Sequence, residues 1–229
     1  RPPRATLFPY TTLFRSKGVE LRQTDLNKQN SAEESLFEQV DSRTRLLTIS
    51  SIQFASGFRL NVEKIGQFCR QRNVLFCVDA IQSIGALEFD VQACFADFAM
   101  ADGHKWMLGP EGLGVFYTSL RARDLLAVTQ FGWHMIEDPN NYANRPWEIA
   151  PDSRRFECGS ANMLGIHALS SSLSLLLEIG LETVEAHVIA NARSLKELIR
   201  SESSLQLISS SDPELVSGIV VFKHRNVKN

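Results

Sequence analysis

The sequence predicts an α/β fold with a parallel sheet. Three short apolar stretches, 45–52, 74–78 and 98–101, have the length and composition of buried strands. The segment between the first two predicts a helix capped by Asn61, because its apolar residues recur on one helical face: Val62, Ile65, Phe68 and Cys69. Strand, helix and strand within about 30 residues is typical of a right-handed crossover between parallel strands.

The remaining elements extend this pattern in both directions. Residues 19–21 and 115–117 are expected to be strands, and 32–40 a helix with Ser31 as its N-cap and Glu34 completing a capping box. The 74–78 stretch is apolar throughout, as in sheets that are covered on both faces. After residue 118 we expect a long loop at 131–154 and two helices, 163–179 and 181–199, separated at Gly180. A Ser-rich connector at 201–211 and a strand at 218–222 follow.

Composition and charge exclude several classes of partner. The chain has 229 residues, of which 44% are hydrophobic and 22% charged, with a net charge of −2. There is no basic stripe with interleaved aromatic residues, so no nucleic-acid partner is expected. No apolar run approaches the roughly 20 residues that cross a bilayer, so no membrane association is expected. The four cysteines are far apart, which predicts no metal site and favours a cytoplasmic location.

The first sixteen residues do not read as part of the fold. Residues 6–16, TLFPYTTLFRS, resemble the in-frame translation of a sequencing-library adapter, and they lack the long apolar centre of a signal peptide. We therefore expect 1–16 to be non-native and the native chain to begin in mid-domain at Lys17.

Three segments carry residues suited to chemistry, and two of them follow predicted strands, where functional groups gather in open α/β sheets. Asp79 ends the strand VLFCV, and a buried carboxylate there needs a cationic partner. Lys105 follows the strand DFAMA between His104 and Trp106, which makes it a candidate for Schiff-base chemistry. The glycines of LGPEGLG, 108–114, allow the backbone to approach a ligand closely.

Together these segments resemble the aminotransferase class V family of pyridoxal-phosphate enzymes, which includes cysteine desulfurases, selenocysteine lyases and isopenicillin-N-epimerase-like proteins. The resemblance lies in VDAIQSIGALEFDV and, about twenty residues later, DFAMADGHKWMLGPEGLGVFY. It implies that the chain is an internal fragment of a fold-type-I enzyme. A three-layer α/β/α cofactor-binding domain would occupy 17–175, without its N-terminal part. A linking helix and the start of a small α+β domain would occupy 176–229.

The resemblance also implies the role of each site residue. Lys105 would join pyridoxal 5′-phosphate as a Schiff base and carry the substrate's α-proton. Asp79 would keep the pyridine nitrogen protonated, and Gln82 would bond the ring's phenolic oxygen. His104 matches a position that contacts the phosphate, and Gln53 falls where the family places an amide near the ring oxygen.

A third segment, RRFECGSAN at 154–162, resembles the family's Arg-Phe-Glu-x-Gly-Thr/Ser motif. The resemblance implies a homodimer in which Ser160 reaches the phosphate in the neighbouring subunit. From the sequence alone, Ser160 is the N-cap of the helix beginning near Met163. Arg155 and Glu157 are expected to form a structural ion pair.

The reaction stays open within the family. Transamination, epimerisation and elimination at an amino acid's α-carbon all fit the motifs. Asp102 stands where many desulfurases carry a phosphate-binding hydroxyl, and this difference favours the epimerase-like branch. A catalytically inactive relative that serves as a binding partner is the alternative, although it predicts loss of Lys105 or Asp79. A Ser/His/Asp hydrolase is not supported, because the sequence contains no Gly-x-Ser-x-Gly elbow.

Overall fold

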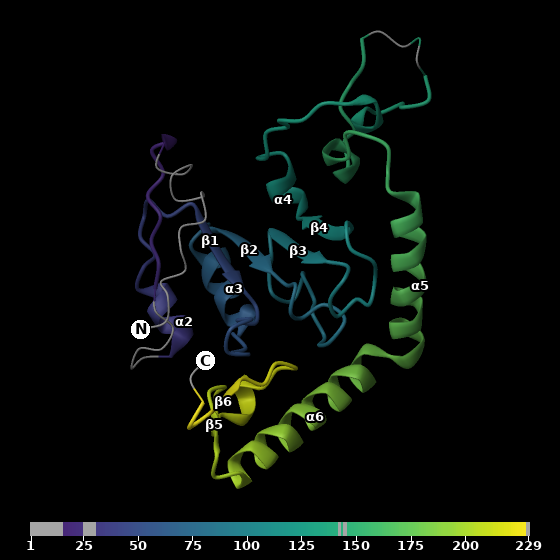
Figure 1. Ribbon diagram of the computed structural model, residues 1–229. Helices are drawn as coiled ribbons and strands as arrows, with labels where there is room; N and C mark the ends of the chain where they lie inside the picture. The colour runs from purple at the N-terminus through teal and green to yellow at the C-terminus, as the bar shows by residue number, and fades with distance from the viewer. Residues whose placement is uncertain (1–15, 25–30, 142, 144–145, 228–229) are drawn as a thin grey trace. The chain divides into compact units, whose positions relative to one another are not determined.

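The computed structural model describes residues 16–24, 31–141, 143 and 146–227 (Figure 1). The chain forms two compact units, residues 1–44 and 45–229. Residues 1–15 lie outside the described part of the chain, so the assignment of 1–16 as non-native stays a prediction.

The first unit contains one short helix and a set of surface ion pairs. Helix α2 spans Ala32–Phe37, and the Ser31 hydroxyl accepts a hydrogen bond of 3.3 Å from the Glu34 N–H, which confirms the predicted N-cap. The strand expected at 19–21 is wrong, because this segment joins no ladder within the described residues. Arg22 instead links neighbouring segments through Glu20 and Asp41, each at 2.9 Å.

The second unit is built on a four-stranded sheet with the order β1-β2-β3-β4 (Figure 1). The strands are β1 Leu46–Ser50, β2 Leu75–Asp79, β3 Phe98–Asp102 and β4 Gly114–Thr118. The first three are parallel, as predicted, and β4 is antiparallel to β3. The reversal follows from the short connection 103–113, because a parallel neighbour needs a longer crossover.

Helix α3, Val62–Gln71, connects β1 to β2 and packs on the sheet. Its N-cap is Asn61, as predicted, whose Oδ1 accepts from the Lys64 N–H at 2.9 Å. Gly66 faces inward so closely that an added Cβ would lie 1.7 Å from the Cys94 carbonyl oxygen and 3.2 Å from the Phe76 ring. The helix therefore needs a glycine at its point of contact.

The two faces of the sheet differ in burial. One face carries buried side chains from adjacent strands: Leu47, Phe76, Val78, Ala99 and Ala101. The opposite face is more open, and Leu46 and Phe116 on it are each 47% exposed. The expectation from 74–78 that both faces are fully covered is thus met on one face only. Asp79 belongs to the more open face, in register with Ser50 and Met100.

A buried ion pair fixes the start of β3. Asp97 is 1% exposed and accepts hydrogen bonds from the Phe76 N–H at 3.0 Å and the Ser119 hydroxyl at 2.9 Å. Arg121 of helix α4, Leu120–Arg123, donates to both carboxylate oxygens, through Nε at 2.6 Å and through Nη2. One carboxylate therefore joins β2, β3 and the segment after β4.

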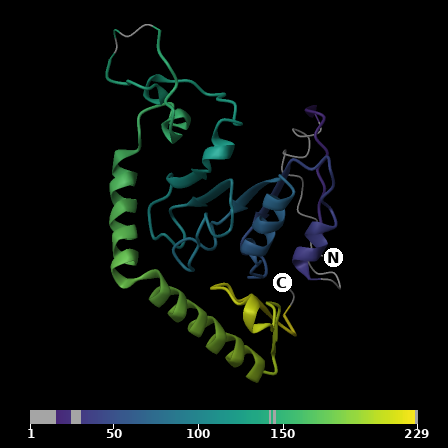
Figure 2. The ribbon, with the colours of Figure 1, turned by 180° about the vertical axis from the view of Figure 1, so that it is seen from behind.

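Two long helices follow a mostly irregular segment that holds the 3₁₀ turns Trp133–Met135 and Ser153–Phe156. Helices α5, Met163–Ile179, and α6, Leu181–Ser201, meet at Gly180, as predicted, which has a φ of +89°. Figure 1 and the rear view in Figure 2 both show the bend. In the described ranges no single helix is long and apolar enough to cross a membrane. The α5–α6 pair passes that test only when taken together, although its two helices are bent by 83°.

The C-terminal segment forms a second, two-stranded sheet. Strands β5, Leu205–Leu207, and β6, Phe222–His224, form an antiparallel pair, with a 3₁₀ turn at Pro213–Leu215 between them. The Ser-rich connector predicted at 201–211 thus contains a short strand that was not predicted, and the strand expected at 218–222 begins only at Phe222. The domain boundary predicted at 175/176 falls inside α5 and stays a prediction.

Two serine hydroxyls hold the C-terminal segment to the loop after β1. Ser209 donates to the Ser56 carbonyl at 2.6 Å and Ser217 to the Gly57 carbonyl at 2.7 Å. A Cβ on Gly57 would lie 2.2 Å from the Ile219 carbonyl oxygen, so the two backbones are in direct contact. The loop that bears Gln53 is thus fixed by residues far along the chain.

Candidate active site

The carboxyl ends of three adjacent parallel strands bring the predicted residues to one edge of the sheet. Strands β1, β2 and β3 end at Ser50, Asp79 and Asp102. Gln53, Gln82 and Lys105 each lie three residues beyond these ends. Because the strands are parallel and in register, their carboxyl ends meet at the same edge. The amine and both amides therefore belong to loops that leave the sheet side by side.

Asp79 is held by neutral donors. Its Oδ1 accepts from the Ile81 N–H at 3.1 Å and its Oδ2 from the Ser50 hydroxyl at 3.1 Å. The expected cationic partner is absent among the residues that the structure describes. A carboxylate has about four lone-pair positions, so each oxygen of this half-buried group keeps the capacity to accept a further hydrogen bond.

Gln82 is held by the indole of Trp106, whose Nε1–H donates to Gln82 Oε1 at 3.2 Å. Below this contact, the buried hydroxyls of Ser51 and Ser83 form a hydrogen bond of 2.6 Å. Ser51 also donates to the Asp79 carbonyl at 3.3 Å. The loops after β1 and β2 are therefore linked by side chains as well as by the ladder.

Lys105 lies in a tightly turned loop. The Gly103 N–H donates to the Leu113 carbonyl and the Gly109 N–H to the Gly103 carbonyl, both at 2.8 Å, and the Leu108 N–H donates to the Lys105 carbonyl at 3.0 Å. Lys105 itself is half-buried. The residue two positions on, Met107, is 1% exposed and packs in a core cluster. Backbone hydrogen bonds and the packing of Met107 therefore hold the loop before and after Lys105.

The glycines after Lys105 serve packing more than ligand approach. A Cβ on Gly109 would lie 2.7 Å from Leu169 of α5, and one on Gly114 would lie 2.9 Å from the Ala101 carbonyl oxygen. Gly112 alone of these three has a positive φ, +79°, and nothing lies within 4 Å of its added Cβ. The expectation that this segment approaches a ligand is thus replaced, at Gly109 and Gly114, by close contact with the protein.

The other predicted site residues, Gln53, His104 and Ser160, differ in their exposure and in their hydrogen bonds. Gln53 is half-buried, and its backbone carbonyl accepts from the Gly57 N–H at 2.7 Å in a closed turn. His104 and Ser160 are exposed. Ser160 is not the N-cap of α5, because the cap is Asn162, whose Oδ1 accepts from the Gly165 N–H at 3.0 Å. The structure therefore brings together the loops of Gln53, Asp79, Gln82 and Lys105, and leaves the reach of Ser160 to another subunit a prediction.

The predicted ion pair between Arg155 and Glu157 is wrong. Arg155 Nη1 lies 2.7 Å from Asp124 Oδ1, and Glu157 is exposed. The pairing joins the 3₁₀ turn at Ser153–Phe156 to the end of α4. Long arginine side chains reach distant acids as readily as near ones, so spacing along the chain did not identify the partner.

Three cysteines are unsuited to nucleophilic chemistry. Burial raises the pKa of the Cys69 thiol to about 12 and also raises the pKa of Cys77 and of Cys94. A thiol is reactive only as a thiolate, so these groups remain inert at neutral pH. No cluster of three or more metal-ligating side chains occurs within the residues described.

Two contributors were missed from the sequence, Ser50 and Trp106. Both act through side-chain hydrogen bonds to residues that were predicted, Asp79 and Gln82. A signal for Ser50 existed, because a hydroxyl at the end of one strand is expected to meet a carboxylate at the end of its parallel neighbour once the register is known. Trp106 was noted only for crowding Lys105.

Comparison with known proteins agrees with these observations. The family model for aminotransferase class-V matches residues 4–229, a range that includes part of the segment predicted to be non-native. A probable cysteine desulfurase from Methanothermobacter thermautotrophicus is 30% identical over 215 residues, covering 93% of this chain and 52% of its own length. A cysteine desulfurase from Cronobacter sakazakii is 29% identical over 202 residues, covering 85% of this chain and 49% of its own. The chain thus spans about half the length of these relatives.

Solved structures share the fold. The apo cysteine desulfurase from Thermococcus onnurineus superposes with a TM-score of 0.85 at 23% identity, covering 96% of this chain and 54% of that one. A cystine C–S lyase, solved with its product cysteine persulfide, gives a TM-score of 0.83 at 23% identity, with coverages of 94% and 57%. The preference for the epimerase-like branch that was drawn from Asp102 stays a prediction. With the fold-type-I architecture established and the family model matching nearly the whole sequence, the chain belongs to the aminotransferase class-V family.

Proposed function

We propose that this chain forms part of a pyridoxal-phosphate enzyme that acts at the α-carbon of an amino acid, with cysteine as the leading substrate. The observation that carries the proposal is the arrangement of Asp79, Gln82 and Lys105 in loops at the carboxyl ends of adjacent strands. The names of the relatives, which are cysteine desulfurases, support a sulfur-containing amino acid as substrate.

The residues present fit this cofactor by the chemistry of their donor and acceptor groups. The site offers one amine, one carboxylate with unused lone pairs and one amide whose oxygen is already bonded. Pyridoxal phosphate supplies an aldehyde that links covalently to an amine and a ring that withdraws electrons from the substrate. An amine, a proton-holding acid and an oxygen-binding amide are the groups such a ring requires.

Each side chain then has a separate task. Lys105 supplies the amine, and its rigid loop keeps that amine at the sheet edge, where it can move a proton to and from the substrate's α-carbon. Asp79 would accept a hydrogen bond from a protonated ring nitrogen, and Ser50 together with the Ile81 N–H fixes the orientation of the carboxylate. Gln82 would donate to the ring's phenolic oxygen. Gln53 would contribute an amide near the ring oxygen, and His104 would contact the phosphate.

We also propose that the active protein is a homodimer in which Ser160 reaches the phosphate bound in the partner subunit. Ser160 is exposed and lies two residues before the Asn162 cap of α5, so its hydroxyl is not used within the described part of the chain. The neighbouring helix N-terminus would favour the same anion.

The test uses protein expressed from its complete gene and incubated with pyridoxal phosphate. We expect a visible absorption band that the Lys105→Ala variant lacks, since the band requires the covalent linkage. Lys64→Ala, on the exposed side of α3, is the matched control and should keep the band. A band of equal strength in the Lys105→Ala protein rejects the lysine assignment. No band in the wild type favours a catalytically inactive relative.

A further inference from the structure

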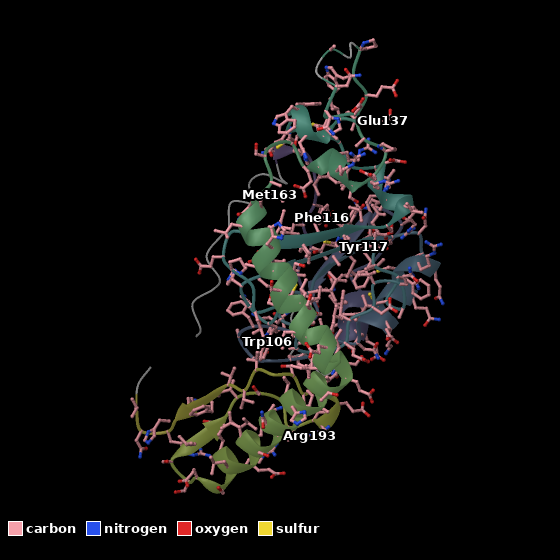
Figure 3. The ribbon with its side chains drawn as sticks, turned by 90° about the vertical axis from the view of Figure 1, so that its right-hand side faces the viewer. Trp106, Phe116, Tyr117, Glu137, Met163 and Arg193 are labelled. Atoms are coloured by element: carbon pink, nitrogen blue, oxygen red, sulfur yellow. The ribbon has the colours of Figure 1, made fainter. Side chains whose placement is uncertain are left out.

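Trp106 connects the lysine loop to the C-terminal segment. Its ring packs with the core cluster of Ile52, Ala86 and Leu87, together with Val188 of α6 and Ile219. Figure 3 shows Trp106 between the lower part of the sheet domain and the C-terminal segment. Its indole N–H, however, is used for the hydrogen bond of 3.2 Å to Gln82 Oε1. A residue that looks like core thus makes a directed polar contact with a predicted cofactor ligand.

This contact determines which way the amide of Gln82 points. The oxygen and nitrogen of a glutamine amide can exchange places by rotation, and a neighbouring serine or water can accommodate either arrangement. An indole N–H is a donor only, so it bonds the amide oxygen and is repelled by the amide NH₂. With Oε1 held by Trp106, the Nε2 group is the part of Gln82 that remains available to a ligand.

Trp106 is closely packed at both ends. A Cβ on Gly85, whose φ is +96°, would lie 2.3 Å from the Trp106 carbonyl oxygen. At the other end of the residue, a Cβ on Gly218 would lie 2.8 Å from Cη2 of the ring. The backbone at Gly85 therefore lies against the main chain of Trp106, and the backbone at Gly218 lies against the far edge of its ring. Contacts at both ends of Trp106 therefore hold the indole whose N–H bonds Gln82.

We propose that Trp106 is a positioning residue, which holds the Gln82 amide so that its NH₂ group donates to the phenolic oxygen of the cofactor. The proposal rests on the proposed function, because it requires pyridoxal phosphate at the sheet edge. With the cofactor bound, a donor at that oxygen would favour its anionic form. The chromophore would then release its proton more easily, so its pKa would be lower than without the donor.

The experiment is a spectrophotometric pH titration of the cofactor-loaded protein, expressed from its complete gene. In Trp106→Phe, which keeps an aromatic ring and loses the N–H, we expect the chromophore pKa to rise by about one unit, the size of one hydrogen bond to a charged group. Gln82→Leu should give at least the same rise. In the double variant, Trp106→Phe should add nothing to Gln82→Leu, because both changes remove the same bond.

A matched control separates positioning from packing. Val188→Ala removes side-chain volume beside the Trp106 ring and keeps the indole N–H. It should lower the thermal unfolding midpoint and leave the chromophore pKa unchanged. A pKa rise in Val188→Ala equal to that in Trp106→Phe would overturn the proposal, because packing alone would then account for the effect.

The remaining outcomes are equally decisive. If the wild type shows the Lys105-dependent band and both Trp106→Phe and Gln82→Leu titrate as the wild type does, the positioning role is rejected while the proposed function stands. If no Lys105-dependent band forms, the proposed function itself fails.

Should Trp106→Phe not fold, the NMR resonance of the Trp106 indole N–H tests the same contact. We expect this resonance to shift in Gln82→Leu and to persist when the cofactor is added to the wild type. Loss of the resonance on cofactor binding refutes the proposal.

Discussion

The Asp97–Arg121 pair gives a sharp prediction for stability, because Arg121 donates to both oxygens of the Asp97 carboxylate. Oδ1 accepts from the Ser119 hydroxyl and Arg121 Nε, and Oδ2 accepts from the Phe76 N–H and Arg121 Nη2. Asp97→Asn preserves the shape and replaces one oxygen with NH₂. Whichever way the amide turns, its NH₂ group then faces an N–H of the Arg121 guanidinium, whereas the Ser119 hydroxyl can turn and accept from it.

The magnitude follows from the bond to Arg121 that is lost in either orientation. A hydrogen bond to a charged group contributes about 1.5–3 kcal/mol, so Asp97→Asn should lower the free energy of unfolding by about that amount. Urea unfolding followed by circular dichroism measures this difference, provided that the slope of the transition stays unchanged.

The matched control is Asp124→Asn, which alters another aspartate that pairs with an arginine. Asp124 is 74% exposed, so its ion pair with Arg155 should contribute less than about 1 kcal/mol. If Asp97→Asn costs no more than Asp124→Asn, burial does not govern the strength of these pairs and the reasoning is wrong.

Two further predictions concern a glycine and a buried lysine. Gly66→Ala should destabilise the protein by about 1–3 kcal/mol in spite of alanine's higher helix propensity, because the added Cβ would lie 1.7 Å from the Cys94 carbonyl oxygen. Gln67→Ala, on the exposed side of α3, isolates the propensity effect, and equal stability of the two variants would contradict the prediction. Lys196 is 4% exposed, and burial, aided by Arg200 and Arg193, lowers its pKa in the folded state. The unfolded chain therefore binds the proton more tightly, and stability should rise with pH between the folded pKa and the unfolded value of about 10.4. Lys196→Met should reduce that rise in urea unfolding measured at several pH values, and identical pH slopes in the two proteins would count against it.

The parts of the fold that depend on local pattern could be predicted from the sequence. The strands ending at Ser50 and Asp79 were indicated by runs of β-branched and apolar residues, and α2 and α3 by Ser31 and Asn61 before an amphipathic stretch. The bend at Gly180 was predicted because glycine alone adopts a positive φ without strain. The direction of β4 was not predicted, because periodicity is the same in either direction.

The parts that depend on spatial neighbours were missed. The two protein donors to Asp79, a serine from the adjacent strand and a local N–H, were not predicted. Ser160 and Asn162 are both good N-cap residues, and only the observed start of α5 decides between them. The bond between Trp106 and Gln82 joins two loops, so no spacing along the sequence indicates it.

The hydroxyl contacts of Ser209 and Ser217 with the loop after β1 imply an order of events during synthesis. Proteins emerge from the ribosome N-terminus first, and contacts between distant residues form only after the later partner has emerged. The turn that carries Gln53 is made early, yet the atoms that secure it, as far as Ile219, are made more than a hundred residues later. The nascent chain can therefore form its sheet before the loop after β1 is secured.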